Sequence, residues 1–204
     1  MNQQTTTQAD DVLPELPAID DTAALDTLRT AFGGKTVLVL APGASLAEEA
    51  GRNAVAAAKA DCIVSANFCP EFCQPDYAFF TNSKRFEKLD LAALPCPVVL
   101  TSNLRPLPQG ALAVNYDRLA APDVQNASLG SNSVLMLLRL LRLCGAKAVL
   151  LAGADGYKPG TPAYADSLLH AHTGRGAAFN TAMAGAIKAC GLDVTFITPS
   201  EYAK

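Results

Sequence analysis

The sequence predicts an α/β fold with a single doubly wound, mostly parallel sheet that carries helices on both faces. Short runs of apolar and β-branched residues, bounded by glycine, proline or asparagine, alternate along the chain with longer segments of helical character. These runs are apolar at successive positions, which is typical of strands buried on both faces of a parallel sheet. Regular alternation of such strands with helices favours a doubly wound, Rossmann-like domain.

Length and composition indicate one globular domain. The chain has 204 residues, of which 50% are hydrophobic and 17% charged, so it can bury a sizeable core. Residues 21–204 are expected to form this domain, preceded by a flexible, acidic segment at 1–20. The net charge of −3 and the absence of a basic cluster give no basis for binding nucleic acid. No apolar run reaches the roughly 18 residues of a membrane span.

The cysteines are expected to stay reduced. The N-terminal residues show neither the basic nor the apolar region of a signal peptide, so we expect a cytoplasmic protein. Cys69 and Cys73 are four residues apart, but a zinc site would need a second pair or nearby histidines. No metal site is therefore predicted at these cysteines. The other cysteines lie in or beside apolar segments, where they are expected to pack as small core residues: Cys62, Cys96, Cys144 and Cys190.

The expected elements follow one another without an internal repeat. Strands are expected at residues 36–40, 61–66, 77–81, 97–101, 112–115, 148–152 and 194–198. Helices are expected at residues 22–32, 46–60, 84–92, from about 133 to 144, and 177–190. Asp21 is expected to cap the first helix and Gly33-Gly34 to end it. Residues 121–130 and 158–176 have the composition of loops.

The turn after the first strand, Ala41 to Ser45, is the first candidate site. Ligands bind beyond the carboxyl ends of strands in an open α/β sheet, and the N-terminus of a helix favours a phosphate. Gly43 and Ser45 are therefore candidate binding residues. The alternative is an ordinary strand–helix turn in which Ser45 and Glu48 form a capping box. The turn matches neither the P-loop nor the dinucleotide-binding fingerprint.

Three successive strands end in an asparagine: Asn67, Asn82 and Asn103. An asparagine at a strand end is often only a turn residue, because its side chain bonds to nearby backbone. In a parallel sheet, however, these ends lie along the same edge as the first turn. Neutral amides at that edge offer both donors and acceptors, which suits a nucleobase, a ribose or a sugar.

Two further turns belong to the same edge. Ser131, Asn132 and Ser133 open the most apolar helix of the chain and form either a second anion site or an ordinary N-cap. Asp155 lies between glycines after the strand 148–152, where it could hold a metal, accept from a ligand hydroxyl, or fix the turn. The loop that follows is long enough to be a lid or binding segment. This loop contains both histidines of the chain, His170 and His172.

Three blocks of sequence together resemble known families. They are VLVLAPGASL, IVSANF followed by FFTN, and GSNSVLMLLRLLRLCGAKAVLLAGADGY. Their order and spacing resemble the bacterial sialyltransferases that build lipooligosaccharide. They also resemble the related 6-hydroxymethylpterin diphosphokinase (MptE-like) family, which includes proteins linked to flagellin glycosylation. The resemblance covers roughly Lys35 to Tyr157 and implies a domain associated with surface-glycan synthesis.

The sialyltransferase resemblance implies roles for several positions. The loop Ala41 to Ser45 would lie against the nucleotide phosphate and ribose, and Asn67 and Asn82 would contact the nucleotide and its sugar. The turn from Ser131 to Ser133 would touch the cytidine part. Tyr157 matches a tyrosine that hydrogen-bonds the phosphate leaving group, where charge develops in the transition state.

The sequence also departs from that pattern. Pro42 stands where the family has a nucleotide-contacting asparagine, and it has no N–H to donate. The second tyrosine of the phosphate pair does not align, although Tyr164 lies near. The catalytic histidine has no clear counterpart, which leaves His170 or His172 as candidates for a general base. A loop histidine can equally be structural.

These observations leave three functional expectations open. The first is a nucleotide-dependent transferase that moves a sugar from a nucleotide-activated donor during surface polysaccharide or glycan synthesis. The second is a diphosphokinase that uses ATP and Mg²⁺, with Asp155 as a metal ligand joined by Asp76 or Asp166. The third is a non-catalytic accessory domain that binds a nucleotide or sugar and serves a partner enzyme. A nucleotide or nucleotide sugar is the expected small-molecule partner, no other cofactor is firmly implied, and a homo-oligomer is compatible with all three.

Overall fold

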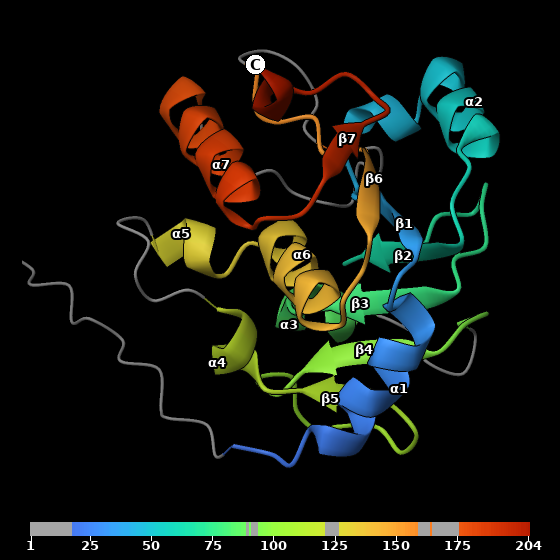
Figure 1. Ribbon diagram of the computed structural model, residues 1–204, viewed down its shortest axis with the longest axis vertical. Coiled ribbons are helices and arrows are strands. Elements are labelled where there is room, and N and C mark those ends of the chain that lie inside the picture. The colour runs from blue at the N-terminus through green and yellow to red at the C-terminus, as the bar shows by residue number, and fades with distance from the viewer. Residues whose placement is uncertain (1–17, 89, 91–93, 121–126, 159–163, 165–175) are drawn as a thin grey trace, which may run out of the picture.

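The computed structural model describes residues 18–88, 90, 94–120, 127–158, 164 and 176–204. Its described strands form one seven-stranded sheet in the order β5-β4-β3-β2-β1-β6-β7 (Figure 1). Every neighbouring pair is parallel, which confirms the predicted fold class. The strands are β1 (Thr36–Leu40), β2 (Cys62–Ala66), β3 (Tyr77–Phe80), β4 (Val98–Thr101), β5 (Leu112–Val114), β6 (Ala148–Ala152) and β7 (Val194–Phe196).

Helices cover both faces of this sheet (Figure 1). They are α1 (Thr22–Phe32), α2 (Glu49–Ala57), α3 (Ser83–Phe86), α4 (Tyr116–Leu119), α5 (Ala127–Gly130), α6 (Ser133–Leu143) and α7 (Ala177–Ala189), with 3₁₀ turns η1 (Ala44–Leu46) and η3 (Glu201–Ala203). Alternate residues of β1 supply the two cores, because successive side chains of a strand point to opposite faces. Val37 and Val39 pack with α1, α6 and α7, whereas Leu38 and Leu40 pack with η1 and α2. The sheet is therefore buried on both sides.

The structure corrects several predicted boundaries. The helix expected at 46–60 is split into η1 and α2, and the helix expected from residue 84 is a single described turn, α3. The segment 121–130, expected to be a loop, contains the short helix α5, and α4 was not expected at all. These turns are too short to show a helical apolar period in the sequence.

Asp21 does not cap α1 in the predicted way. Its buried carboxylate accepts from the N–H of Asn115 at 3.0 Å and from Nε and Nη2 of Arg118 at 3.0 and 3.2 Å. The N–H of Thr22 instead donates to Asp20. Burial opposes ionisation of Asp21, but the bonds from Asn115 and Arg118 outweigh it, so its pKa lies below the usual value. Asp21 therefore ties the start of α1 to the segment after β5.

Asp21→Asn is expected to lower the free energy of unfolding at pH 7 by about 1–3 kcal/mol, because a charged, buried acceptor is lost. The folded-state pKa of Asp21 lies below the ordinary value of 3.8. Its stabilisation is therefore present above pH 3.8 and is lost as the pH falls through the lower folded-state pKa. Urea unfolding of both proteins at pH 7 and near pH 3 should show the difference shrinking with acidification.

Asp26→Asn is the matched control for that experiment. Asp26 is an exposed carboxylate on the same helix and pairs with Arg29 at 2.7 Å. An exposed pair of this kind contributes at most about 1 kcal/mol, so this variant should unfold almost like the wild type. Equal effects of the two substitutions would contradict the role given to Asp21.

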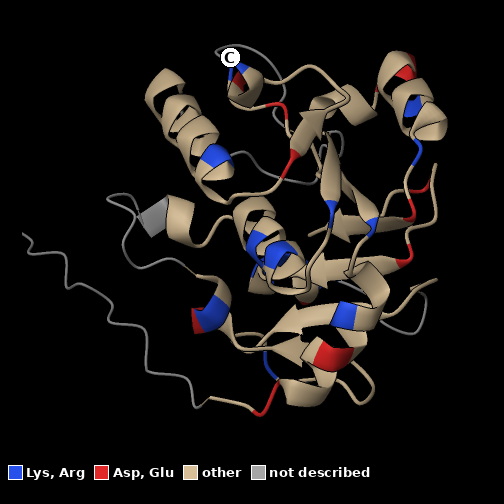
Figure 2. Cartoon of the chain, viewed as in Figure 1, with Lys and Arg blue, Asp and Glu red and all other residues tan. Residues whose placement is uncertain are grey.

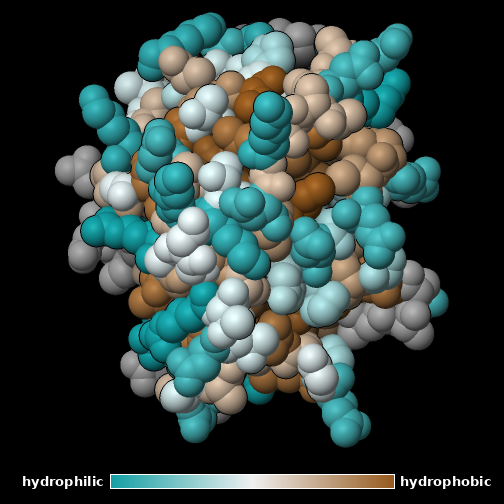
Figure 3. All heavy atoms as spheres, turned by 45° about the vertical axis from the view of Figure 1, so that its right-hand side comes forward, coloured by the Kyte–Doolittle hydropathy of each residue, from teal (hydrophilic) through white to brown (hydrophobic). Residues whose placement is uncertain are grey.

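The outer surface is mainly polar on the side shown in Figure 3, where apolar residues lie in patches between hydrophilic side chains. Within the described residues, no helix is both long and apolar enough to cross a membrane.

Candidate functional site

The strand order reverses between β1 and β6. The chain runs outward from β1 through β2 to β5 in one direction, whereas β6 and β7 lie on the other side of β1. Ligands of doubly wound sheets bind in the crevice beyond the carboxyl ends of the strands at such a switch point. A cavity of about 330 Å³ opens there, lined by residues that follow β1, β2, β3 and β6 and by the start of α6.

Two glycines let the ends of β1 and β6 come together. The N–H of Gly43 donates to the carbonyl of Gly153 at 2.7 Å. A Cβ on Gly43 would lie 2.1 Å from that carbonyl oxygen, and a Cβ on Gly153 would lie 2.0 Å from the carbonyl oxygen of Ala41. Gly153 also has a φ of 70°, which disfavours any side chain. The floor of the cavity is therefore backbone, and its shape depends on both glycines.

Asp155 uses its carboxylate to fix the turn after β1. One oxygen accepts from the N–H of Ser45 at 2.7 Å and the other from its Oγ at 2.6 Å. Burial raises the pKa of Asp155, and the two bonds from Ser45 offset part of that effect. Ser45 is itself buried and does not line the cavity.

This pair corrects the prediction for the first turn. The capping box is wrong, because Glu48 occupies the N-cap position of α2 and Ser45 bonds to Asp155. Ser45 is a candidate binding residue by sequence, but its N–H already donates to the carboxylate of Asp155. Of the two candidates in this turn, only Gly43 lines the cavity.

The three strand-end asparagines act as turn residues, and two of them also line the cavity. Asn67 has a left-handed backbone with φ of 59°, and its Oδ1 accepts from the N–H of Thr81 at 2.9 Å. Asn82 caps α3 by accepting from the N–H of Arg85. Asn103 donates to the carbonyl of Thr81 at 3.1 Å and does not line the cavity. Their side chains thus hold the ends of β3 and β4 in place.

The start of α6 lines the cavity with small polar residues. Asn132 is an ordinary N-cap, since its Oδ1 accepts from the N–H groups of Val134 and Leu135 at 3.0 and 3.3 Å. Ser131 and Ser133 flank it and also line the cavity. A hydrogen bond links Ser131 to Tyr116, whose pKa is raised by burial.

Tyrosines dominate the aromatic lining. The chain has five tyrosines, and four of them line this cavity: Tyr116, Tyr157, Tyr164 and Tyr202. The predicted site residue Tyr157 is held from both sides. Its ring packs edge-on against Phe179 at 5.4 Å, and its backbone exchanges two hydrogen bonds with the side chain of Asn180.

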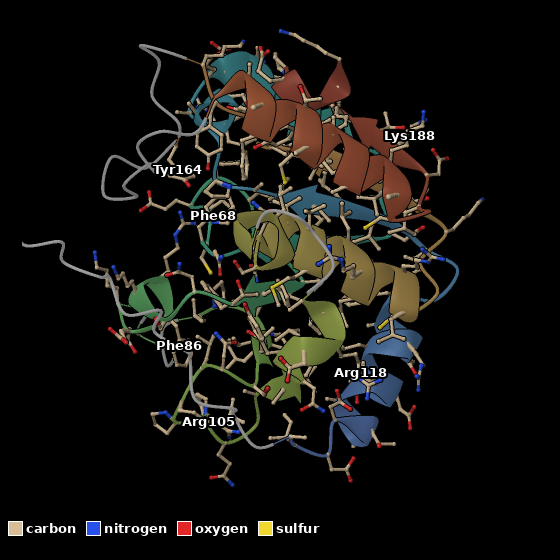
Figure 4. All side chains as sticks on the ribbon, turned by 90° about the vertical axis from the view of Figure 1, so that its left-hand side faces the viewer. Phe68, Phe86, Arg105, Arg118, Tyr164 and Lys188 are labelled. Carbon is tan, nitrogen blue, oxygen red and sulfur yellow. The ribbon has the colours of Figure 1, made fainter. Side chains whose placement is uncertain are left out.

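Arg85 carries the only positive charge among the described residues that line the cavity. Its guanidinium lies 4.9 Å above the centre of the Tyr164 ring, and its Nη1 donates to the carbonyl of Asn67 at 3.3 Å. Tyr164 in turn pairs with Gly43 in an isolated β-bridge and is labelled in Figure 4. The cation is therefore held in a fixed position at the edge of the cavity.

Sequence reasoning missed Arg85, Tyr116 and Tyr202. One signal could have found the first of these. Arg85 lies in the segment directly after the predicted strand 77–81, and ligands of an open α/β sheet bind beyond the carboxyl ends of its strands. Tyr116 and Tyr202 reach the cavity through tertiary packing, for which we find no local signal.

Other predicted residues lie outside the described part of the chain or away from the cavity. His170, His172 and Asp166 lie outside the described residues. Asp76 precedes β3 and accepts from the N–H of Ile63 at 2.7 Å, which places it at the opposite edge of the sheet from Asp155. Across the described residues, no group of three or more His, Cys, Asp or Glu side chains could hold a metal ion. All six cysteines are free thiols.

Searches for similar proteins give no further guidance, because no family model, curated protein or solved structure matches the chain.

Proposed function

We propose that the chain binds a nucleotide or nucleotide sugar in the cavity between β1 and β6 and acts as a nucleotide-dependent transferase. The proposed reaction is transfer of the sugar from a nucleotide-activated donor during surface-glycan synthesis. One observation carries the proposal: four tyrosines and a single arginine surround a polar cavity at the switch point of the sheet. The free cysteines agree with a cytoplasmic location, which is part of the proposal.

The lining offers a partner for each part of such a ligand. Tyrosine rings pack against a base or a sugar ring and supply hydroxyl groups for hydrogen bonds. Arg85 suits a phosphate, because a guanidinium presents several donors in a fixed plane. Its contacts with Tyr164 and Asn67 fix its position before the ligand arrives, which lowers the entropy lost on binding. Tyr157 is proposed to donate to the leaving phosphate, as the family resemblance implies.

Arg85→Ala is expected to weaken binding of the nucleotide that binds wild-type protein most tightly by about 10- to 100-fold, which corresponds to about 1.4–2.7 kcal/mol. Isothermal titration calorimetry measures the effect. Arg29→Ala is the matched control, since Arg29 is an exposed arginine on α1 that does not line the cavity. Equal affinities of the Arg85 variant and the control would show that the phosphate lies elsewhere.

A non-catalytic binding domain is the second candidate, and one observation favours it. Asp155 is the only carboxylate among the described lining residues, and both of its oxygens already accept from Ser45. A transferase with a histidine base requires His170 or His172 instead. His170→Ala and His172→Ala should then abolish turnover of the donor while ligand affinity stays within about twofold of the wild type.

Tyr157→Phe complements the histidine variants. If the chain is a transferase, loss of this hydroxyl should lower turnover more than affinity, because the hydroxyl acts on charge that develops in the transition state. A binding domain would show no turnover to lose in any variant, and only its affinity would change.

The diphosphokinase alternative has no observation in its favour. Magnesium binding would need carboxylates that converge, whereas Asp155 is the only carboxylate in the described lining and Asp76 lies at the other edge of the sheet. The described residues therefore do not fit Mg²⁺ at this site. Tight binding of ATP that depends on magnesium would revive this alternative.

A further inference from the structure

A second cavity lies among α4, α6 and α7, away from the proposed nucleotide site. Its volume is about 670 Å³, and it shares no lining residue with the first cavity. Its lining includes three arginines, Arg118, Arg139 and Arg142, and an apolar floor that includes Leu143, Ala186 and Ala189. Figure 2 shows the basic residues of α4, α6 and α7 on one side of the molecule. Figure 4 shows Arg118 and Tyr164 at opposite sides of the view.

Helix ends hold two of these guanidinium groups. Nη1 of Arg139 donates to the carbonyls of Leu119 at 2.7 Å and Gly130 at 3.2 Å, the last residues of α4 and α5. Nη1 of Arg142 donates to the carbonyl of Cys190 at 2.6 Å, at the end of α7. These bonds give both arginines a structural role, because cations stabilise helix C-termini. These bonds use only Nη1 of each guanidinium, and a guanidinium has five N–H donors in all.

Among the described residues, no carboxylate pairs with Arg139 or Arg142, whereas Asp21 pairs with Arg118. No acidic residue belongs to the described lining of this cavity. The protein as a whole carries a net charge of −3, so the cavity is a local concentration of positive charge on an acidic molecule.

The floor of the cavity includes an exposed apolar side chain. Leu143 is 38% exposed, and the only other large hydrophobic residue in the described chain that is similarly exposed is Phe72, at 40%. Enrichment in arginine and depletion of acidic residues are typical of protein–protein interfaces. The cavity therefore has the composition of an interface.

We propose that this cavity binds an acidic segment of a partner polypeptide. This proposal does not depend on the proposed nucleotide site. An apolar side chain of the segment packs on Leu143, Ala186 and Ala189, and flanking carboxylates pair with Arg139 and Arg142. A polypeptide fits better than a small inorganic anion, because the arginines are held by the ends of different helices and the floor between them is apolar. It fits better than a membrane surface, because the site is concave.

The experiment uses the full chain and a short labelled peptide in which glutamate alternates with leucine. Fluorescence anisotropy is expected to show saturable binding with Kd below about 1 mM. Leu143→Asp should weaken it by about tenfold or more, since the new carboxylate repels the peptide and the apolar contact is lost. Phe72 is a similarly exposed apolar residue outside the cavity, so Phe72→Asp should leave the affinity unchanged.

Two comparison peptides complete the test. Replacing glutamate by glutamine tests the charge, and replacing leucine by serine tests the apolar contact; each is expected to weaken binding. Thermal unfolding of both variants checks that they remain folded, and Leu143→Asn separates loss of the apolar side chain from charge repulsion. No binding by the wild-type chain would overturn the proposal. Equal binding of all peptides, or equal effects of the two aspartate variants, would overturn it too.

Discussion

Gly153→Ala is expected to lower the free energy of unfolding by more than about 3 kcal/mol, or to prevent folding. The added methyl group would lie 2.0 Å from the carbonyl oxygen of Ala41 and 2.8 Å from Leu46, and the backbone φ of 70° disfavours alanine. Relief of the clash would require β1 and β6 to separate at the switch point. Chemical denaturation, followed by circular dichroism, measures the loss.

Gly145→Ala isolates the contribution of the backbone conformation. Gly145 has a similar φ of 76°, but its Cβ would meet no atom within 4 Å. The left-handed conformation alone disfavours alanine by about 1–2 kcal/mol, so this variant should lose much less stability than Gly153→Ala. Equal losses would mean that close approach of β1 and β6 contributes nothing, and the structural basis of the cavity floor would then be wrong.

Asp155→Ala is expected to lower the free energy of unfolding by about 2–4 kcal/mol, because the buried N–H and hydroxyl of Ser45 both lose their acceptor. Ser45→Ala removes only the hydroxyl bond and should lower it by about 1 kcal/mol. Urea unfolding at pH 7 compares the two variants. Asp155 therefore stabilises the fold directly, whatever its contribution to ligand binding.

Ionisation of Asp155 makes the free energy of unfolding depend on pH in a direction that its pKa determines. Burial raises the folded-state pKa of Asp155 above its ordinary value of 3.8. The folded protein therefore holds this proton more tightly than the unfolded chain, and ionisation of Asp155 destabilises it as the pH rises from 3.8 through the higher pKa. The free energy of unfolding of the wild type should therefore fall over that range relative to that of Asp155→Asn, which does not ionise. A wild-type value that rises relative to the variant would contradict the buried environment of Asp155.

The strands could be predicted closely from sequence, because each is a short continuous run of apolar and β-branched residues. Residues Thr36–Leu40 and Ala148–Ala152 form strands with the predicted bounds. Helical segments of a single turn, such as α4 and α5, could not be predicted, because four residues cannot display a helical period.

The chemistry of the site was only partly visible in the sequence. Ser45 matched a local capping motif, but its actual partner, Asp155, is 110 residues away. The strand-end asparagines lie at the predicted edge of the sheet. Their side chains bond to nearby backbone groups, as the alternative interpretation, that they are turn residues, predicts. Where several strands end side by side, a distant residue such as Asp155 can replace the local partner that a motif predicts for a turn residue.

The central claim is that the cavity between β1 and β6 binds a nucleotide or nucleotide sugar. Isothermal titration of wild-type protein with CMP, CDP, UDP, GDP and nucleotide sugars tests it most directly. At least one of these ligands is expected to bind saturably at a single site with Kd below about 1 mM, and to raise the thermal stability accordingly. If none of them binds the folded wild-type protein, the proposed function is wrong.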